Sequence, residues 1–524
     1  MRGLCGAIEI QPPRGEIVVP AAGLEPLDYT VLVFYFAGVV GLGFLFRKNP
    51  TLADYFLAGR STHWSLVGIS IVATLFSAVS FVAMPGEAYA HGLSLYPRSP
   101  MVVLVAPLVI WLFLPFYHRS PIFTVFELLE RRFNLAARLI GSGIFLLVRG
   151  AYVAVVFYAS AKAFQPALGL PMTTIIMLVG VIAVFYTYLG GMRAVIWTDV
   201  VQFIILFGGI LFVLVRLVLS ADGGIGGIYS YATAYERGFD LWATQEFYSF
   251  SLYERVTLWS MLAYVLVWNS YTYGVDQLTV QRYLSTSNLK SAVRSTVFQF
   301  LLLIPFVACF WFVGTALFHH YGMNPAIAPP ATVEEDSILC YYITRELPAG
   351  IVGLIFGAIL AAVMSTVDSG INSLTTSTIV DFYQRLGRKP RTEAAYVSLS
   401  KRWVIIWGVF CVASACFIAL VSEKANATII EVTAIWGNLN AVLLGVFLLA
   451  MLTRRFTSGC AYAAFGVGSL VTIYVSTVYF YWRPPEERIS FLWIGAIILA
   501  ATLAAGILVG TLLRLTSRFS RSAT

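Results

Sequence analysis

The stretch A-A-V-M-S-T-V-D-S-G-I-N-S-L-T-T-S, residues 361–377, places a carboxylate and a row of hydroxyls inside an apolar run long enough to cross a membrane. Four residues at offsets 0, 3, 4 and 7 would share one face of a helix: Ala362, Ser365, Thr366 and Ser369. Such a face either packs closely against another helix or supplies oxygen ligands to a hard cation. Asp368 borders it, and a carboxylate at bilayer depth costs about 3 kcal/mol. Asp368 and a second intramembrane carboxylate, Asp199, favour the cation site.

The composition of the whole chain agrees with a membrane setting. Of the 524 residues, 59% are apolar and 11% are charged, and the mean hydropathy is +0.82. A soluble domain carries about a quarter charged residues, so this chain lacks the polar surface to cover its core in water. The composition excludes a soluble multidomain enzyme, a disordered protein and a nucleic-acid binder.

Runs of about 20 mostly apolar residues predict the membrane-crossing helices. Thirteen such runs lie at 27–46, 64–84, 99–117, 136–164, 171–190, 194–219, 256–276, 292–318, 348–378, 401–422, 427–452, 459–482 and 489–514. We number them as segments one to thirteen. The sequence therefore predicts an all-α membrane protein with thirteen transmembrane helices, preceded by a loose tail at 1–26 and followed by a short tail at 515–524.

The basic residues predict the orientation of these helices. Lys and Arg gather in the loops after odd-numbered segments, including Arg282 after segment seven, whereas the opposite loops at 220–255 and 322–346 are acidic. Because cytoplasmic loops carry the excess of Lys and Arg, we expect the N-terminus outside and the C-terminus in the cytoplasm. The expected location is the plasma (inner) membrane.

Two further segments carry polar residues. Segment two contains hydroxyls at Thr74, Ser77 and Ser80, and Pro85-Gly86 is expected to end it. Segment seven reads V-W-N-S-Y-T-Y-G-V-D-Q and carries a carboxylate, Asp276, near its inner end. Broken helices near the midplane expose carbonyls and helix ends to ions and solutes in many secondary transporters.

Segments two and seven stand five apart, which is the spacing expected of two inverted five-helix repeats. The predicted organisation therefore has an extra helix at 27–46, a first repeat at 64–219, a second repeat at 256–452 and two peripheral helices at 459–514. A nucleotide-binding loop and an H-E-x-x-H sequence do not occur in the chain, and its five His lie at or beyond segment edges. No enzymatic cofactor, nucleic-acid partner or obligate protein partner is expected.

Four motifs in order resemble the sodium:solute symporter family, which includes sodium/glucose, iodide, monocarboxylate, vitamin and proline symporters. They are D-Y-F-L-A-G-R at 54–60, Y-T-Y-L-G-G-M-R-A-V-I-W-T-D-V-V-Q at 186–202, D-Q-L-T-V-Q-R-Y-L-S at 276–285 and S-T-V-D-S-G-I-N-S at 365–373. The resemblance covers about 27–455. It implies a LeuT-like core of ten helices in inverted repeats, preceded by one extra helix, that works by alternating access with Na⁺ as the coupling ion.

The resemblance also implies a sodium site shared by segments two and nine. Its ligands would be the backbone carbonyls of Ala73, Phe76 and Ala362 and the hydroxyls of Ser365 and Thr366. Some family members carry a second sodium site, which maps to Asp199, Ser365, Asp368 and Ser369. Asp368 stands there where such members have Ser, so this site is the less secure of the two. Asp368 either strengthens it, pairs with Arg149 or takes a proton.

The solute pocket is expected between segments two, three, four, seven and eleven. Its candidate residues are Thr74, Ser77, Ser80, Arg98, Ser99, Tyr152, Asn269, Thr272, Asn438 and Asn440. Leu75 and Tyr152 replace residues that recognise sugar and sialate elsewhere in the family. An anionic solute would need a cation, which either Arg98 or Arg149 supplies. Alternatively Arg149 is a structural partner of Asp199 or Asp368, and Arg98 is a loop residue.

The expected function is Na⁺-coupled symport of a small polar organic solute, either a monocarboxylate-like anion or a sugar. The alternatives are a proton-coupled carrier and a channel or sensor on the same scaffold. A channel would favour a continuous polar face on several helices, whereas the polar residues here cluster at one depth.

Overall fold

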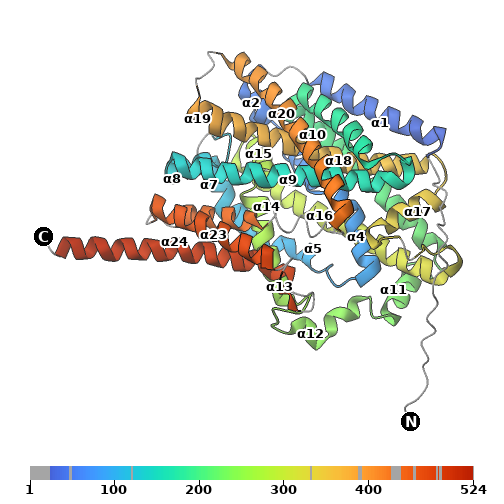
Figure 1. Cartoon of the computed structure of the whole chain (residues 1–524). Coiled ribbons are helices and arrows are strands. Elements are labelled where there is room, and N and C mark those ends of the chain that lie inside the picture. The colour runs from blue at the N-terminus through green and yellow to red at the C-terminus, as the bar shows by residue number, and fades with distance from the viewer. Residues whose placement is uncertain are drawn as a thin grey trace, which may run out of the picture.

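The computed structural model describes residues 24–46, 50–119, 122–330, 333–387, 392–425, 438–452, 456–478, 482 and 487–522, and the regular elements in these ranges are helices (Figure 1). Within these ranges, nine helices are long and apolar enough to cross a membrane, or ten if one bent pair counts as a single span. The expected tail at 1–26 lies almost entirely outside the described residues.

The long helices lie beside a set of shorter helical pieces. Eight of the long helices are α1 (Pro26–Leu45), α9 (Leu135–Leu168), α10 (Met172–Ser220), α16 (Leu289–Met323), α18 (Ile351–Ser377), α20 (Glu393–Ala425), α23 (Ser458–Thr477) and α24 (Phe491–Ser522). The ninth, Arg98–His118, is built from short pieces that run from α5 (Arg98–Met101) to α7 (Leu114–His118). Shorter helices are α2 (Leu52–Leu57), α3 (Trp64–Leu75), α4 (Ala78–His91), α8 (Glu127–Arg132), α11 (Gly224–Ala234), α12 (Gln245–Tyr248), α13 (Leu258–Tyr264), α14 (Ser270–Gly274), α15 (Gln277–Leu284), α17 (Ile338–Glu346), α19 (Gln384–Leu386) and α22 (Leu439–Leu452).

The boundary predicted between segments five and six lies at a break within α10. The 49 residues of this element would measure about 74 Å at 1.5 Å per residue, more than twice the hydrocarbon core. Gly191, between the predicted segments at 171–190 and 194–219, breaks the helix with φ 61° and ψ −168°, a conformation that only glycine adopts readily. Element α10 therefore consists of two helices that meet at this kink.

Segment two is a broken helix, but the break lies before the expected point. Helix α3 ends at Leu75, and α4 begins at Ala78 with a 65° change of direction. Pro85-Gly86 does not end the segment, since α4 continues to His91 with Pro85 inside it. Gly314 of α16 packs against this part of α4: a Cβ there would lie 2.2 Å from the Pro85 carbonyl oxygen, so the two helices pack backbone to backbone.

Segment seven is also interrupted. Helix α13 passes through a π-helical turn at Val265–Asn269 into α14, and the chain then breaks before α15. Asp276 is the N-cap of α15, and its carboxylate accepts a hydrogen bond from Leu278 N at 3.1 Å. In segment eleven, residues 426–437 lie outside the described residues, and α22 covers the remainder.

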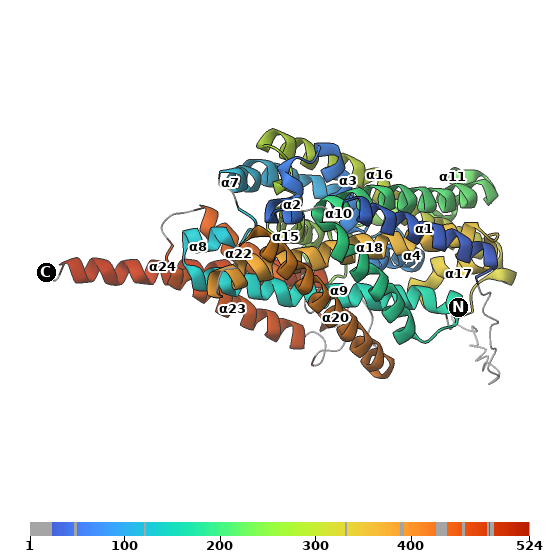
Figure 2. The same ribbon diagram turned by 90° about the horizontal axis from the view of Figure 1, so that it is seen from above.

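Helix α18 lies at the centre of the bundle, between α1, α9 and α10 (Figures 1 and 2). Every residue from Ile355 to Ser377 is buried, including the polar ones. Asp28 of α1 caps its N-terminus, because the carboxylate accepts the N–H groups of Gly350 and Gly353 at 2.7 Å each. At the other end of the chain, α24 extends beyond the rest of the bundle and continues to Ser522, past the predicted boundary at 514.

Candidate functional site

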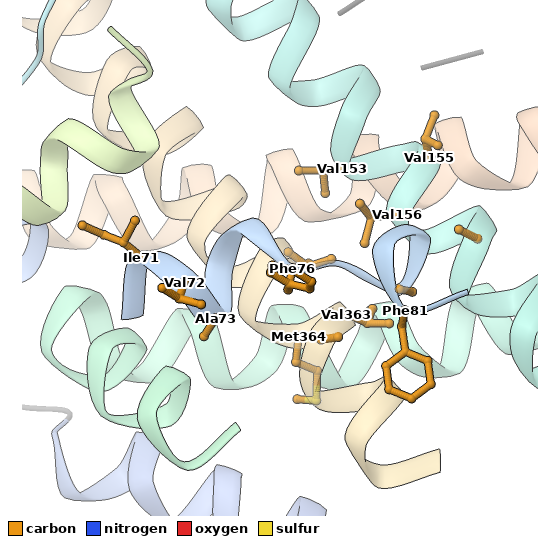
Figure 3. Close-up of a cluster of buried hydrophobic side chains, with 14 of the residues drawn as sticks. Ile71, Val72, Ala73, Phe76, Phe81, Val153, Val155, Val156, Val363 and Met364 are labelled. Carbon is orange, nitrogen blue, oxygen red and sulfur yellow. The ribbon is translucent and has the colours of Figure 1, made fainter. Parts of the chain in front are cut away.

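The break between α3 and α4 faces the hydroxyl-bearing side of α18. Phe76 and Ser77 have extended backbone, so the last carbonyls of α3 lack the helical N–H partners they would otherwise have. Figure 3 shows this connection as non-helical, with Phe76 on it and Val363 and Met364 of α18 nearby. The broken helix thus presents backbone oxygens to a fully buried partner helix.

The five residues predicted for the main sodium site come together at this break. Ser365 Oγ lies 3.0 Å from the carbonyl oxygen of Ala73 and 3.2 Å from that of Ala362. Thr366 Oγ1 lies 3.1 Å from the Ala362 oxygen and 3.5 Å from that of Phe76. It also lies 3.0 Å from the oxygen of Thr74, a residue not in the predicted set.

The donors and acceptors of this cluster do not balance. The hydroxyls of Ser365 and Thr366 make five contacts with carbonyl oxygens. They have only two hydrogens between them, and each hydrogen can be donated to one acceptor at a time. Surplus carbonyl and hydroxyl oxygens in a buried site are the ligands that a small hard cation prefers. The residues present therefore fit Na⁺.

The residues predicted for a second sodium site also lie near one another. Asp199 Oδ2 accepts hydrogen bonds from Ser70 Oγ at 2.5 Å and Thr74 Oγ1 at 3.2 Å, and Thr74 Oγ1 lies 3.2 Å from Ser369 Oγ. Asp368 Oδ1 accepts from Ser369 Oγ at 3.1 Å, and its Oδ2 accepts from Tyr186 Oη at 2.6 Å. Both carboxylates are fully buried.

Arg282 corrects the sequence interpretation. The residue was expected in a cytoplasmic loop, but its side chain is fully buried and its Nη2 lies 3.0 Å from Asp199 Oδ2. The same Nη2 contacts Ser369 Oγ, and Nε donates to Ser70 Oγ at 2.7 Å. The apolar run ends before Arg282, so periodicity gave no reason to place it in the core. Its place in the D-Q-L-T-V-Q-R motif was the available signal.

Arg149 also has a different partner from those expected. It pairs with Asp276 across the break before α15, and not with Asp199 or Asp368. Its guanidinium carbon lies 5.4 Å from the ring centroid of Tyr152, within the range of a cation–π contact. The pair joins α9 to the interrupted segment seven.

A cavity of about 460 Å³ adjoins these groups. It is lined by nine of the ten predicted solute residues: Thr74, Ser80, Arg98, Ser99, Tyr152, Asn269, Thr272, Asn438 and Asn440. The tenth, Ser77, lies behind Tyr152, whose hydroxyl donates to Ser77 Oγ at 3.4 Å. Thr74 and Phe76 line the cavity as well as flanking the hydroxyl cluster, so the end of α3 and the break that follows it border both.

The site has a broken helix that presents carbonyls to an ion-sized cluster, and this cluster lies next to a polar cavity within a helical membrane bundle. Such an arrangement defines an ion-coupled secondary transporter. The chain belongs to the sodium:solute symporter family, whose profile matches residues 55–468. It is accordingly a Na⁺-coupled solute symporter and not an enzyme.

Individual relatives agree with this assignment. The sodium/sialic acid symporter SiaT of Proteus mirabilis is 30% identical over 455 residues, 85% of this chain and 88% of the relative. The human sodium-coupled monocarboxylate transporter 1 is 28% identical over 474 residues, 88% of this chain and 75% of the relative.

Solved structures agree on the fold. A substrate-bound, outward-open Na⁺-coupled sialic acid symporter superposes with a TM-score of 0.83 at 28% identity, covering 93% of this chain and 98% of that one. Mhp1, a nucleobase-cation-symport-1 transporter, superposes with a TM-score of 0.57 at 15% identity, covering 88% and 96%, which shows the fold alone. The chain therefore has a LeuT-like fold, as the motifs predicted.

Proposed function

We propose that this protein takes up a small polar organic solute together with Na⁺ by alternating access. The observation that carries the proposal is the segment Thr74–Phe76, where α3 ends and the break before α4 begins. The carbonyl oxygens of Thr74 and Phe76 lie 3.0 and 3.5 Å from Thr366 Oγ1, and both residues line the cavity that nine predicted solute residues also line. An ion bound at the carbonyls would fix the same backbone on which the solute rests, so binding of each would favour the other.

The main sodium ligands in this proposal are the carbonyls of Ala73, Phe76 and Ala362 and the hydroxyls of Ser365 and Thr366. The unbalanced hydroxyl and carbonyl count of this cluster supports the assignment. Asp199, Ser365, Asp368 and Ser369 form the proposed second site. Arg282 already contacts Asp199 and Ser369, which makes this second site the weaker of the two.

The thirteen-span topology, with the N-terminus outside and the C-terminus in the cytoplasm, remains part of the proposal. Helix α10 divides into two spans at Gly191, and the pieces α13 to α15 together form one. The break between α3 and α4 has a counterpart in the break before α15, five spans later, as inverted repeats at 64–219 and 256–452 require.

Uptake into proteoliposomes tests this function. Sugars, monocarboxylates, amino acids and nucleosides are screened under an imposed Na⁺ gradient, and in parallel under a proton gradient without Na⁺. We expect Na⁺-stimulated accumulation of at least one solute. If no solute responds to Na⁺, the proposed coupling is refuted, and a response to protons alone supports the proton-coupled alternative.

A further inference from the structure

Three arginines line the cavity, and they differ in their partners. Arg149 is paired with Asp276. Arg255 is paired with Glu87, with Nη2 2.8 Å from one carboxylate oxygen. Arg98 makes no ion pair among the residues that the structure describes, and its described contact is with the Tyr264 ring, 5.7 Å from the guanidinium carbon to the centroid. Among the described lining residues, Arg98 is therefore the one arginine whose charge no carboxylate balances.

From this difference we infer that the transported solute is an organic acid whose carboxylate is recognised by Arg98. The inference rests on the proposed function and names the substrate class that the function left open. A lone guanidinium on a partly apolar wall attracts anions more strongly than one in water, because the surroundings screen it less. A guanidinium also offers two parallel N–H donors, which match the two oxygens of a carboxylate.

Arg149 is not equivalent to Arg98 in this role. Its charge is already balanced by Asp276, and its ring contact with Tyr152 holds it against the cavity wall. A solute carboxylate at Arg149 would meet a charge that Asp276 already balances and would lie near that buried carboxylate, so its electrostatic gain would be smaller than at Arg98. Arg98 binds a carboxylate without breaking an ion pair of the described chain.

The remainder of the cavity indicates what else the acid carries. Asn440 Oδ1 is buried without a hydrogen-bond partner among the described residues, so it requires a donor. Asn440 is also a cavity-lining residue, and Asn269 and Thr272 line the same space. An acid with hydroxyl or amide N–H groups would supply such donors, whereas a simple aliphatic acid would leave Asn440 unsatisfied.

Binding to purified protein in detergent tests the inference without a sodium gradient. Trp268 and Trp311 line the cavity, so tryptophan fluorescence reports its occupancy. The probes are matched pairs in which only the carboxylate differs: a sugar acid and its parent sugar, and a hydroxy acid and its amide, each titrated in saturating Na⁺. We expect an acid to bind about tenfold or more tightly than its neutral partner.

Two variants then test whether Arg98 supplies the positive charge that binds the carboxylate. Arg98→Gln should remove this preference for the acid, and Arg98→Lys should restore part of it, because charge returns without the bidentate geometry. The Na⁺-induced fluorescence change and the melting temperature serve as folding controls for both variants. Arg216→Gln is the matched control for a lost guanidinium charge outside the cavity, since Arg216 does not line the cavity and its Nη2 donates to Glu346 O at 3.2 Å, and it should keep the preference.

Several outcomes would overturn the inference: neutral partners that bind as well as the acids, an acid preference that survives Arg98→Gln in a folded variant, or no binding of any acid. These results are distinguishable from failure of the proposed function, which would appear as the absence of a Na⁺ effect on uptake of any solute. An acid that binds through Arg98 without Na⁺-stimulated uptake would support the recognition site and refute the coupling.

Discussion

Removing one hydroxyl from the centre of the bundle should weaken sodium binding without unfolding the protein. Ser365 Oγ bridges two helices, since it lies 3.0 Å from the Ala73 oxygen of α3 and 3.2 Å from the Ala362 oxygen of its own helix. Ser365→Ala deletes a proposed sodium ligand and one hydrogen bond between α18 and α3, at a position that is 1% exposed.

The magnitude follows from what that hydroxyl contacts. In the sodium-free protein the change loses one neutral hydrogen bond, about 1 kcal/mol. In the sodium-bound protein it loses an interaction with a charge, which is worth about 1.5–3 kcal/mol. The difference, about 0.5–2 kcal/mol, is the loss of binding free energy, so sodium affinity should fall by about 2- to 30-fold if the ion does not recruit a water in place of the hydroxyl. The melting temperature without sodium should fall by only a few degrees.

The same helix supplies a matched control. Ser373 is also fully buried, but its hydroxyl donates to Gly370 O of its own helix at 2.9 Å and makes no described contact with the α3–α4 break. Sodium binding is measured by tryptophan fluorescence on both purified variants, and by the sodium concentration for half-maximal uptake in proteoliposomes. Equal sodium affinities for Ser365→Ala, Ser373→Ala and the unmodified protein would remove Ser365 from the site.

Three further predictions concern stability. Arg149→Ala or Asp276→Ala should each lower the free energy of unfolding by about 3–5 kcal/mol, because each leaves the other charge buried without its partner. In thermal unfolding, the double variant should lose less stability than the sum of the two single variants. Additive losses would show that the pair is incidental. Gly314→Ala should lower the melting temperature, because its Cβ would lie 2.2 Å from the Pro85 oxygen. Gly208→Ala is the control and should not lower it, since no neighbouring atom lies within 4 Å of the added Cβ. Equal effects of the two changes would contradict the close packing of α4 and α16. Burial raises the pKa of Glu130, but hydrogen bonds and charges from Arg138 and Arg385 outweigh it and lower the pKa below its ordinary value. The stabilisation by Glu130 is therefore present above its unfolded pKa and is lost as pH falls through the lower folded pKa. Glu130→Gln should flatten the decline of the melting temperature below about pH 5. An unchanged slope of melting temperature against pH would refute this contribution.

The sequence predicted the site better than it predicted the ion pairs. The hydroxyl face of α18 follows from helical periodicity, which depends on local spacing, and it lies where the motifs placed it. Arg149 and Asp276 are 127 residues apart, and Arg282 and Asp199 are 83 apart, so their pairing depends on how helices cross in three dimensions. A single sequence contains no periodic signal for such crossings. Nine of the ten candidate solute residues line the cavity, but the ion-pair partners of its arginines were not predicted.

The break at Phe76 and the persistence of α4 beyond Pro85 illustrate the same limit. Local rules favour a helix end at Pro85-Gly86, since proline lacks the N–H that a helix interior needs. Pro85 nevertheless lies inside α4, where the α16 backbone at Gly314 packs against its carbonyl. The break itself lies at Phe76, nine residues nearer the N-terminus, where it exposes carbonyls to α18.

The cap that Asp28 places on α18 has a mechanical consequence. The buried carboxylate of Asp28 accepts two hydrogen bonds of 2.7 Å, which join the first helix to the start of the helix that carries Ser365 and Thr366. A tilt of α18 without a matching movement of α1 would break both hydrogen bonds and leave the buried Asp28 carboxylate without these donors. We therefore expect α1 and the N-terminal end of α18 to move together, with the hinges of the proposed transport cycle elsewhere in the bundle.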